Sequence, residues 1–187
     1  MNTKRIMSLV IAATFLLSVP VLAGELAGVK LPDTLSVGGK TLKLNGMGLR
    51  KKMGFKVYVG GLYLESPSKD ASAIMSGDTA RAVTMHFIRD VGKKKLVETF
   101  NEGFENNAKE KAVAQKANID KLLALVVDMK DGDEVTYAYD PAKGVSVILG
   151  GKVVGTIEGK DFAPVLFSLW LGPKPPSEDL KNGMLGK

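Results

Sequence analysis

The stretch from Gly46 to Glu65, GMGLRKKMGFKVYVGGLYLE, constrains the fold of this chain more than any other part of the sequence. It contains two apolar runs with a basic turn between them, a pattern that predicts two strands. In the second run, Phe55–Leu64, side chains alternate between two faces that are both mostly apolar. This predicts a strand covered on both sides, as a central strand under helices would be. The Gly60-Gly61 pair would weaken such a strand unless it allows a bend or close packing against the backbone.

The same residues resemble a known family. The order Gly-x-Gly-x-Arg, followed by Phe-Lys-x-Tyr-x-x-Gly-Leu-Tyr-Leu-Glu, is similar to the chalcone isomerase superfamily, in particular to its bacterial chalcone isomerase-like members. The plant enzymes read approximately Gly-Ala-Gly-x-Arg and then Phe-x-Lys-Phe-Thr-Ala-Ile-Gly-Val-Tyr-Leu-Glu, with a longer loop after the arginine. The resemblance extends more weakly through residues 93–107 and the tail Trp170–Gly186.

The N-terminus has the layout of a targeting segment. Lys4 and Arg5 precede the apolar run Ile6–Val19, and Val21-Leu22-Ala23 is a small-residue exit. This predicts a signal peptide over residues 1–23, cleaved after Ala23, and export to a bacterial periplasm. The alternative is an uncleaved membrane anchor, but the apolar run is shorter than the roughly 20 residues that a spanning helix needs. The absence of a cysteine beside the cleavage site excludes a bacterial lipoprotein.

Composition narrows the class of protein further. Residues 24–187 suit a single domain, which we expect to be chalcone isomerase-like, and the absence of cysteine excludes both a disulfide and a thiolate nucleophile. The formal net charge of +6 falls by two when Lys4 and Arg5 are removed. Such a mild excess of positive charge favours solubility and transient attraction to anionic surfaces such as a membrane. It does not amount to a nucleic-acid-binding signature, because no basic stripe is interleaved with aromatic residues.

The remaining elements are predicted from periodicity and turn residues. Strands and terminal helices flank a helical middle, an order that predicts an α+β fold with a mainly antiparallel sheet. The resemblance implies the open-faced β-sandwich of the chalcone isomerase type, in which helices pack on one face of a large curved sheet and enclose an apolar cavity. The expected elements are a hairpin at Gly38-Gly39, a short helix within 66–79, a strand over Arg81–Arg89, helices over Gly92–Lys116 (capped by Asp90) and Ile119–Met129, strands over Glu134–Tyr139, Gly144–Leu149 and Lys152–Ile157, a helix from an Asp161 cap to Leu171, and a final helix from a Ser177 cap to Leu185.

Arg50 is the strongest candidate for a functional residue. A guanidinium offers a planar fork of donors that matches a carboxylate and stays charged when buried. In the superfamily, the matching arginine lies in the ligand cavity, where it holds a fatty-acid carboxylate in the binding proteins and acts on the flavanone substrate in the enzymes. The alternative is an arginine at a strand end that pairs with a surface carboxylate.

Tyr58 stands where the plant enzymes carry a cavity threonine. Its phenol can donate a hydrogen bond to an anion or carbonyl beside Arg50, although an ordinary core aromatic is an equal alternative. Tyr63 matches a family tyrosine on the opposite face of the strand, which indicates packing rather than ligand contact.

Two residues that catalysis in the plant enzymes depends on are missing from the helix expected over Gly92–Lys116. The plant isomerases begin this helix with Thr-Gly-x-x-Tyr and carry an asparagine farther along. Aligning Gly92 with that glycine puts Lys95 in place of the tyrosine and Glu102 in place of the asparagine. The cavity threonine near the end of the chain also lacks a match, because Ser168-Leu169 stands there. Three residues of this helix remain candidate ligand contacts, only because of their positions along it: Lys95, Thr99 and Glu102.

Two further features carry weaker interpretations. Lys93-Lys94-Lys95 in a first helical turn is either an anion-facing rim at a cavity mouth or a solvated face, and the macrodipole disfavours cations there. His86 is the only histidine, so a core or cavity-lining role is favoured over a catalytic base and a metal site is not expected.

The sequence therefore predicts an exported, non-catalytic protein that binds a fatty acid or similar apolar carboxylate in a cavity anchored by Arg50, with candidate contacts from Tyr58 and His86 and no cofactor. Two alternatives stay open: a chalcone–flavanone isomerase-type intramolecular lyase, and an interaction module without a ligand.

Overall fold

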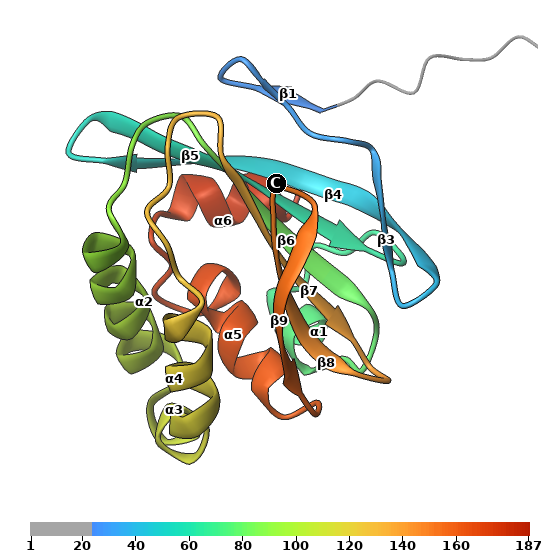
Figure 1. The fold of residues 1–187 in the computed structure, drawn as a ribbon. Helices are drawn as coiled ribbons and strands as arrows, with labels where there is room; N and C mark the ends of the chain where they lie inside the picture. The colour runs from blue at the N-terminus through green and yellow to red at the C-terminus, as the bar shows by residue number, and fades with distance from the viewer. Residues whose placement is uncertain (1–23) are drawn as a thin grey trace, which may run out of the picture.

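The computed structural model describes residues 24–187, so the predicted signal peptide lies outside the described residues. A curved antiparallel sheet of seven strands carries the helices on one face, and a small two-stranded ribbon lies on the other side (Figure 1). The sheet order is β3-β4-β5-β6-β7-β8-β9, so each strand pairs with its neighbour in sequence. The predicted α+β fold, with a large antiparallel sheet and helices on one face, is confirmed.

The bounds of the elements are as follows. The strands are β1 Glu25–Leu26, β2 Val29–Lys30, β3 Thr34–Val37, β4 Lys40–Lys52, β5 Phe55–Leu64, β6 Arg81–Phe87, β7 Glu134–Asp140, β8 Gly144–Leu149 and β9 Lys152–Glu158. The helices are α1 Ala71–Ser76, α2 Lys93–Asn107, α3 Lys109–Ala114, α4 Lys116–Ala124, α5 Phe162–Leu171 and α6 Glu178–Met184.

Strands β4 and β5 form a long hairpin closed by a two-residue turn. Lys52 pairs with Phe55, which leaves Met53 and Gly54 as the turn residues, with φ of 50° and 81°. Such a pair of left-handed residues matches the twist of the flanking strands. Near the turn the register shifts: Arg50 pairs with Tyr58 but Lys51 pairs with Lys56. Val57 is therefore the extra residue of a β-bulge, a feature that bends a strand and redirects the side chains around it.

Strand β5 is covered on both sides, as predicted, but helices cover only one of them. Leu62 and its neighbours on that face pack into the main core under the helices. On the other face Val59 packs with Leu31 of the N-terminal segment, and the Tyr63 hydroxyl donates to the Pro32 carbonyl at 2.8 Å. The chain before β3 therefore replaces the expected second layer of helices.

The glycines of β4 and β5 allow helix α6 to approach the sheet backbone. A Cβ on Gly48 would lie 2.1 Å from the Leu180 carbonyl oxygen, and one on Gly46 would lie 2.2 Å from that of Gly183. On β5, a Cβ on Gly60 would meet the Leu180 side chain at 2.9 Å. The close packing predicted at Gly60 is thus present, and it fixes α6 over the strand that carries Arg50.

The long helix predicted over Gly92–Lys116 is wrong in its second half. Helix α2 ends at Asn107, and Ala108 separates it from α3, which begins at Lys109 with φ of 41°. The Asn107 side chain donates to the Lys174 carbonyl oxygen at 2.9 Å and accepts from the Lys174 N–H at 2.7 Å. The helix therefore ends where it is tied to the segment after α5, a contact that the sequence pattern does not reveal. The predicted helix over Ile119–Met129 is also shifted, because α4 starts at Lys116 and ends at Ala124.

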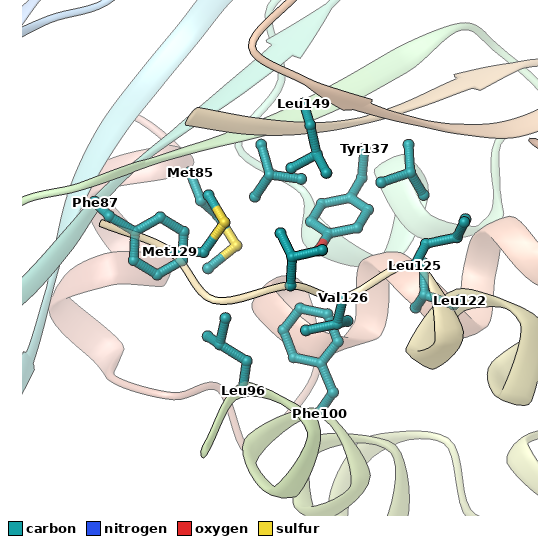
Figure 2. Close-up of a pocket in the computed structure, with 13 residues that line it drawn as sticks. Met85, Phe87, Leu96, Phe100, Leu122, Leu125, Val126, Met129, Tyr137 and Leu149 are labelled. Atoms are coloured by element: carbon teal, nitrogen blue, oxygen red, sulfur yellow. The ribbon is translucent and has the colours of Figure 1, made fainter. Parts of the chain in front are cut away.

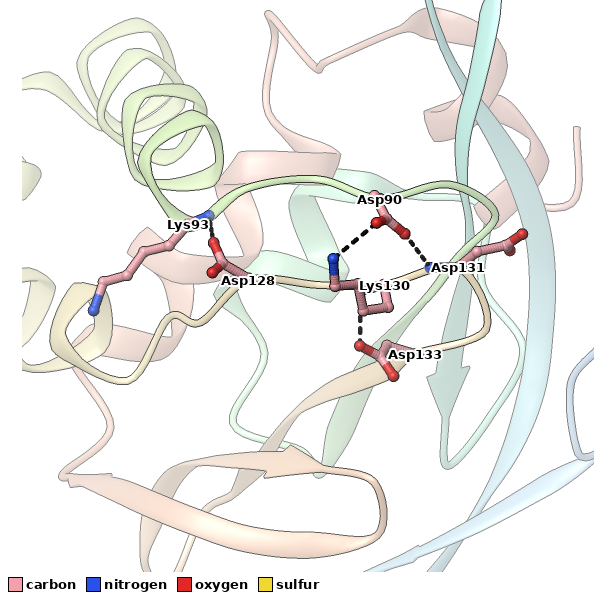
Figure 3. A network of polar contacts seen from close by, with 6 residues as sticks. All are labelled: Asp90, Lys93, Asp128, Lys130, Asp131 and Asp133. Atoms are coloured by element: carbon pink, nitrogen blue, oxygen red, sulfur yellow. Dashed lines mark hydrogen bonds and ion pairs between the residues drawn. The ribbon is translucent and has the colours of Figure 1, made fainter.

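Asp90 does not cap α2 as predicted. Its carboxylate accepts from Lys130 Nζ at 2.9 Å and from the Asp131 N–H at 3.0 Å, and these hydrogen bonds lower its pKa (Figure 3). The first N–H of the helix, on Lys93, instead donates to the Asp128 carboxylate at 2.6 Å. The acceptor for the helix start thus comes from a distant loop. The two loops are joined by the isolated bridge between Val91 and Met129.

The other two predicted caps differ in outcome. Asp161 makes no side-chain capping hydrogen bond to α5, because its backbone is already helical, with φ of −70° and ψ of −20°. Ser177 has an extended backbone and its hydroxyl accepts from the Leu180 N–H at 3.2 Å, so the predicted cap of α6 is confirmed.

Candidate functional site

A hollow of about 210 Å³ opens between the β4–β5 hairpin, helix α2 and the end of α5. It lies on the helix-covered side of the sheet, where the bulge near Arg50 bends β5. We call it the mouth pocket. Its lining combines basic side chains with aromatic and aliphatic ones: Arg50, Lys52, Tyr58, Met85, Leu96, Thr99, Phe100, Glu102, Gly103, Asn106, Leu169, Trp170, Lys174, Pro175 and Pro176.

Arg50 and Tyr58 are cross-strand partners, so their side chains lie on the same face of the sheet. Arg50 is half-buried, and its Nη1 donates to the carbonyl of Lys51. No carboxylate within residues 24–187 lies within 4.0 Å of its guanidinium. The alternative of a strand-end arginine paired with a surface carboxylate therefore has no support in this part of the chain.

Tyr58 is a buried phenol beside that guanidinium. Burial raises the pKa of Tyr58 well above its usual range, against smaller lowering contributions from the Trp170 indole N–H and the Arg50 guanidinium. The phenol is therefore neutral at physiological pH and keeps a proton that it can donate. Its ring packs at 5.6 Å from that of Phe87. Tyr58 is thus a core aromatic whose polar end reaches the pocket.

The charge balance of the mouth pocket favours an anion. Three of its side chains are cationic, namely Arg50, Lys52 and Lys174, and only Glu102 is anionic. Glu102 is exposed, so water screens it more than it screens the half-buried Arg50. A carboxylate at Arg50 would accept a paired set of hydrogen bonds from its planar fork.

A second, apolar pocket adjoins the mouth pocket, and Figure 2 shows the side chains that line it. Its free volume is only about 10 Å³, roughly enough for one water molecule. Met85, Leu96 and Phe100 line both pockets and so form the wall between them. Behind this wall the lining is almost wholly aliphatic and aromatic: Phe87, Leu122, Leu125, Val126, Val127, Met129, Val135, Tyr137, Val147 and Leu149.

The structure brings together four of the six side chains proposed from the sequence. Arg50, Tyr58, Thr99 and Glu102 all line the mouth pocket. The Thr99 hydroxyl is nevertheless engaged with its own helix, since it donates to the Lys95 carbonyl oxygen at 2.9 Å. The geometry thus offers Arg50 and Tyr58 as the groups whose donors face a ligand.

His86 and Lys95 do not line the mouth pocket. Side chains alternate along β6, and His86 pairs with Val59, so it lies on the face away from the helices. There its Nδ1 is 2.7 Å from the Glu134 carboxylate. Lys95 is exposed on α2, and its Nζ lies 2.9 Å from the Glu98 carboxylate, the main cause of its raised pKa. The lysine-rich first turn is therefore a solvated face.

Several lining residues were not anticipated. Gly103 and Asn106 follow Thr99 at the spacing of one helix face, so helical periodicity could have identified them. Trp170, by contrast, comes from another helix, and Lys174 from the segment that Asn107 ties to α2. No local pattern places these two residues beside Arg50.

Comparisons with known proteins place the chain in a family and agree with its fold. The model of the family described as chalcone isomerase-like matches residues 23–186. The chain belongs to the chalcone isomerase-like family. A solved structure with the same fold is a fatty-acid binding protein of Arabidopsis thaliana, at 15% sequence identity and a TM-score of 0.64, with 84% of this chain and 92% of that chain covered. No curated protein sequence matches the chain.

Within residues 24–187, no helix is both long and apolar enough to cross a membrane. The same residues contain no cluster of three or more histidine, aspartate or glutamate side chains that could hold a metal ion.

Proposed function

We propose that this chalcone isomerase-like protein binds a fatty acid or a similar apolar carboxylate, with Arg50 as the anchor of the carboxylate. The observation that carries the proposal is the position of a half-buried arginine, without a carboxylate partner in the described chain, next to an apolar interior. A solved protein of the same fold is a fatty-acid binding protein, which supports the same ligand class.

The acyl chain would extend from the mouth pocket into the apolar pocket. The mouth pocket is smaller than the roughly 300–1,000 Å³ of typical ligand sites, so binding requires the shared wall to move. Met85 in that wall is an unbranched, flexible side chain that adapts to a new shape at low cost. Rotation of Leu96 or Phe100 would join the two pockets into one elongated cavity.

We propose binding rather than catalysis for this site. An isomerase of the plant type needs groups that orient a phenolate and stabilise an enolate. Lys95 and Glu102 occupy the positions of the tyrosine and asparagine that the resemblance associates with this role. Lys95 points to Glu98 instead of the pocket.

We further propose that the protein is an exported bacterial protein that works in the periplasm after cleavage behind Ala23. The support is the basic start, the apolar run and the small-residue exit of residues 1–23. Intact-mass measurement of periplasmic protein tests this, and retention of residues 1–23 in a membrane fraction would contradict it.

Titration with a medium-chain fatty acid tests the anchor. Arg50→Ala should weaken binding about ten- to a hundred-fold, because a hydrogen bond to a charged group contributes about 1.5–3 kcal/mol. Arg50→Lys should recover only part of the affinity, since an ammonium lacks the planar fork. Lys43→Ala removes one positive charge from the same strand, away from the pocket, and should bind like the wild type.

Equal affinities for Arg50→Ala and Lys43→Ala would contradict the role of Arg50 as the anchor, and no detectable binding by any of these proteins, the wild type included, would favour the interaction module without a ligand. Melting curves on the same proteins show whether Arg50→Ala has unfolded, and we expect its stability to change little or to rise, because even a half-buried arginine without a ligand is costly to desolvate.

A further inference from the structure

The tip of the β4–β5 hairpin, Lys51–Lys56, exposes two large apolar side chains. Met53 is 89% exposed and Phe55 is 63% exposed. Every other aromatic side chain within residues 24–187 is buried. In Figure 1 the hairpin extends at the upper left beyond the helices, next to the loop that leads into α2. The tip is therefore both apolar and prominent.

These two residues do not serve the hairpin itself. The turn places Met53 at φ of 50°, a conformation that favours glycine, asparagine or aspartate and disfavours a methionine. Neither side chain belongs to any of the three core clusters. Apart from the Arg89 guanidinium over the Phe55 ring, the described fold gains no hydrophobic packing from these side chains, which points to a surface that a partner covers.

Cations surround the apolar tip. Lys51, Lys52 and Lys56 are exposed on the hairpin, and the tip itself contains no acidic residue. Arg89 adds a fourth charge, with its guanidinium 5.0 Å from the centre of the Phe55 ring. The acidic residue that follows Arg89, Asp90, is engaged by Lys130.

We propose that the hairpin tip docks on an anionic lipid surface, with Met53 and Phe55 among the acyl chains and the surrounding cations against the headgroup phosphates. Apolar side chains ringed by long basic ones match the layered chemistry of such a surface. The tip is a narrow turn and lacks the flat contact area of roughly 800 Å² per partner that a stable protein interface buries. Docking would bring the mouth pocket, which Lys52 also lines, to the lipid surface.

Co-sedimentation with vesicles tests this proposal without a bound ligand. The protein should bind phosphatidylglycerol-containing vesicles and bind phosphatidylcholine vesicles far more weakly, because the cations need an anionic partner. M53S/F55S should weaken the binding about tenfold or more through the loss of apolar insertion. K51Q/K56Q should weaken it by about fivefold for each lysine, and added salt should do the same to the wild type.

The matched control is V153S/V154S. Val153 and Val154 are also exposed apolar residues, at 62% and 42%, but three strands of the sheet separate β9 from β5. This variant should bind vesicles like the wild type. All variants carry the same N-terminal sequence, so residues 1–23 cannot account for a difference between them.

A Phe55→Trp variant reports insertion directly. Its added fluorescence should shift to shorter wavelength and be quenched by brominated lipids, over the constant signal of the buried Trp170. Unchanged vesicle binding by M53S/F55S, or equal binding to both lipids, would overturn the proposal. So would a wild-type dimer in sedimentation velocity that M53S/F55S abolishes, since the tip would then be covered by a second copy.

Discussion

Two arginines on the helix-facing side of the sheet have different environments. Arg81 is 1% exposed and donates to the carbonyl oxygens of Gly77, Thr79 and Met75 at 2.7–3.2 Å. Its guanidinium also lies 4.6 Å from the Tyr139 ring, and burial lowers the pKa of Arg81 to about 10. Arg50 has no comparable set of partners. Residue type alone could not separate a structural arginine from one available to a ligand.

We expect Arg81→Ala to destabilise the protein by about 3 kcal/mol or more, because it leaves three part-buried carbonyl oxygens without their charged donor and opens a cavity where the buried Arg81 side chain was. Denaturant unfolding measures the loss. Arg89→Ala removes an exposed arginine near the end of the same segment and should cost no more than about 0.5 kcal/mol. Similar losses for the two variants would show that the Arg81 contacts contribute little.

Elements with a strong local signal were predicted well. The alternation of Phe55–Leu64 gave the bounds of β5 to the residue, and the Gly150-Gly151 turn correctly joined β8 and β9. The helix errors share a different physical cause. Both ends of α2 are determined by contacts with residues distant in sequence. At its end the Asn107 side chain binds the Lys174 backbone, and at its start the Lys93 N–H donates to the Asp128 carboxylate. The local sequence pattern cannot predict such long-range contacts.

A prediction about helix α2 concerns the carboxylate that accepts from its first N–H. Asp128→Ala removes the acceptor of the Lys93 N–H and should destabilise the protein by about 0.5–2 kcal/mol, the usual effect of losing a helix N-cap. Asp90→Ala should cost less, because its ion pair with Lys130 is exposed to solvent. Thermal or denaturant unfolding of both variants checks the order. A larger loss for Asp90→Ala would restore the capping role that the sequence suggested.

At the scale of the whole molecule, the family resemblance predicted the sheet with helices on one face, and Arg50 gave the position of the candidate site. The resemblance implied an apolar cavity, but its small volume could not be predicted, because that volume depends on how side chains such as Phe100 and Leu122 from separate helices fill it. The cover of β5 by Leu31 was missed for a similar reason, since nothing in that short segment specifies which face it packs on.

The core also makes the whole molecule sensitive to alkali. Burial raises the pKa of Tyr58, Tyr63 and Tyr137 well above the usual value and that of Tyr139 to about 12. Unfolded tyrosines ionise near pH 10, so the unfolded state releases protons that the folded state retains. Stability is thus fully present below pH 10 and falls above it by about 1.4 kcal/mol per pH unit for each tyrosine.

Arg81 has the opposite effect on stability. Because its pKa is lowered in the folded state, the unfolded state binds more protons above pH 10, and this group alone would make the stability rise with pH. It is a single group, whereas four tyrosines make the stability fall. We therefore expect the tyrosine absorbance change and the loss of the native Trp170 fluorescence to occur together above pH 10. Tyrosine ionisation near pH 10 with unchanged Trp170 fluorescence would contradict this expectation.

The central claim, that Arg50 holds a carboxylate at the edge of an apolar interior, is tested most directly by the ionisation of the bound ligand. A fatty acid labelled with ¹³C at its carboxyl carbon reports that ionisation by NMR. In the wild type, the pKa of the bound carboxyl group should lie below that of the free acid, because the guanidinium stabilises the charged form. In Arg50→Ala the apolar surroundings should raise it instead, and Lys43→Ala should match the wild type. A bound carboxyl group that titrates identically in wild type and Arg50→Ala would contradict the account.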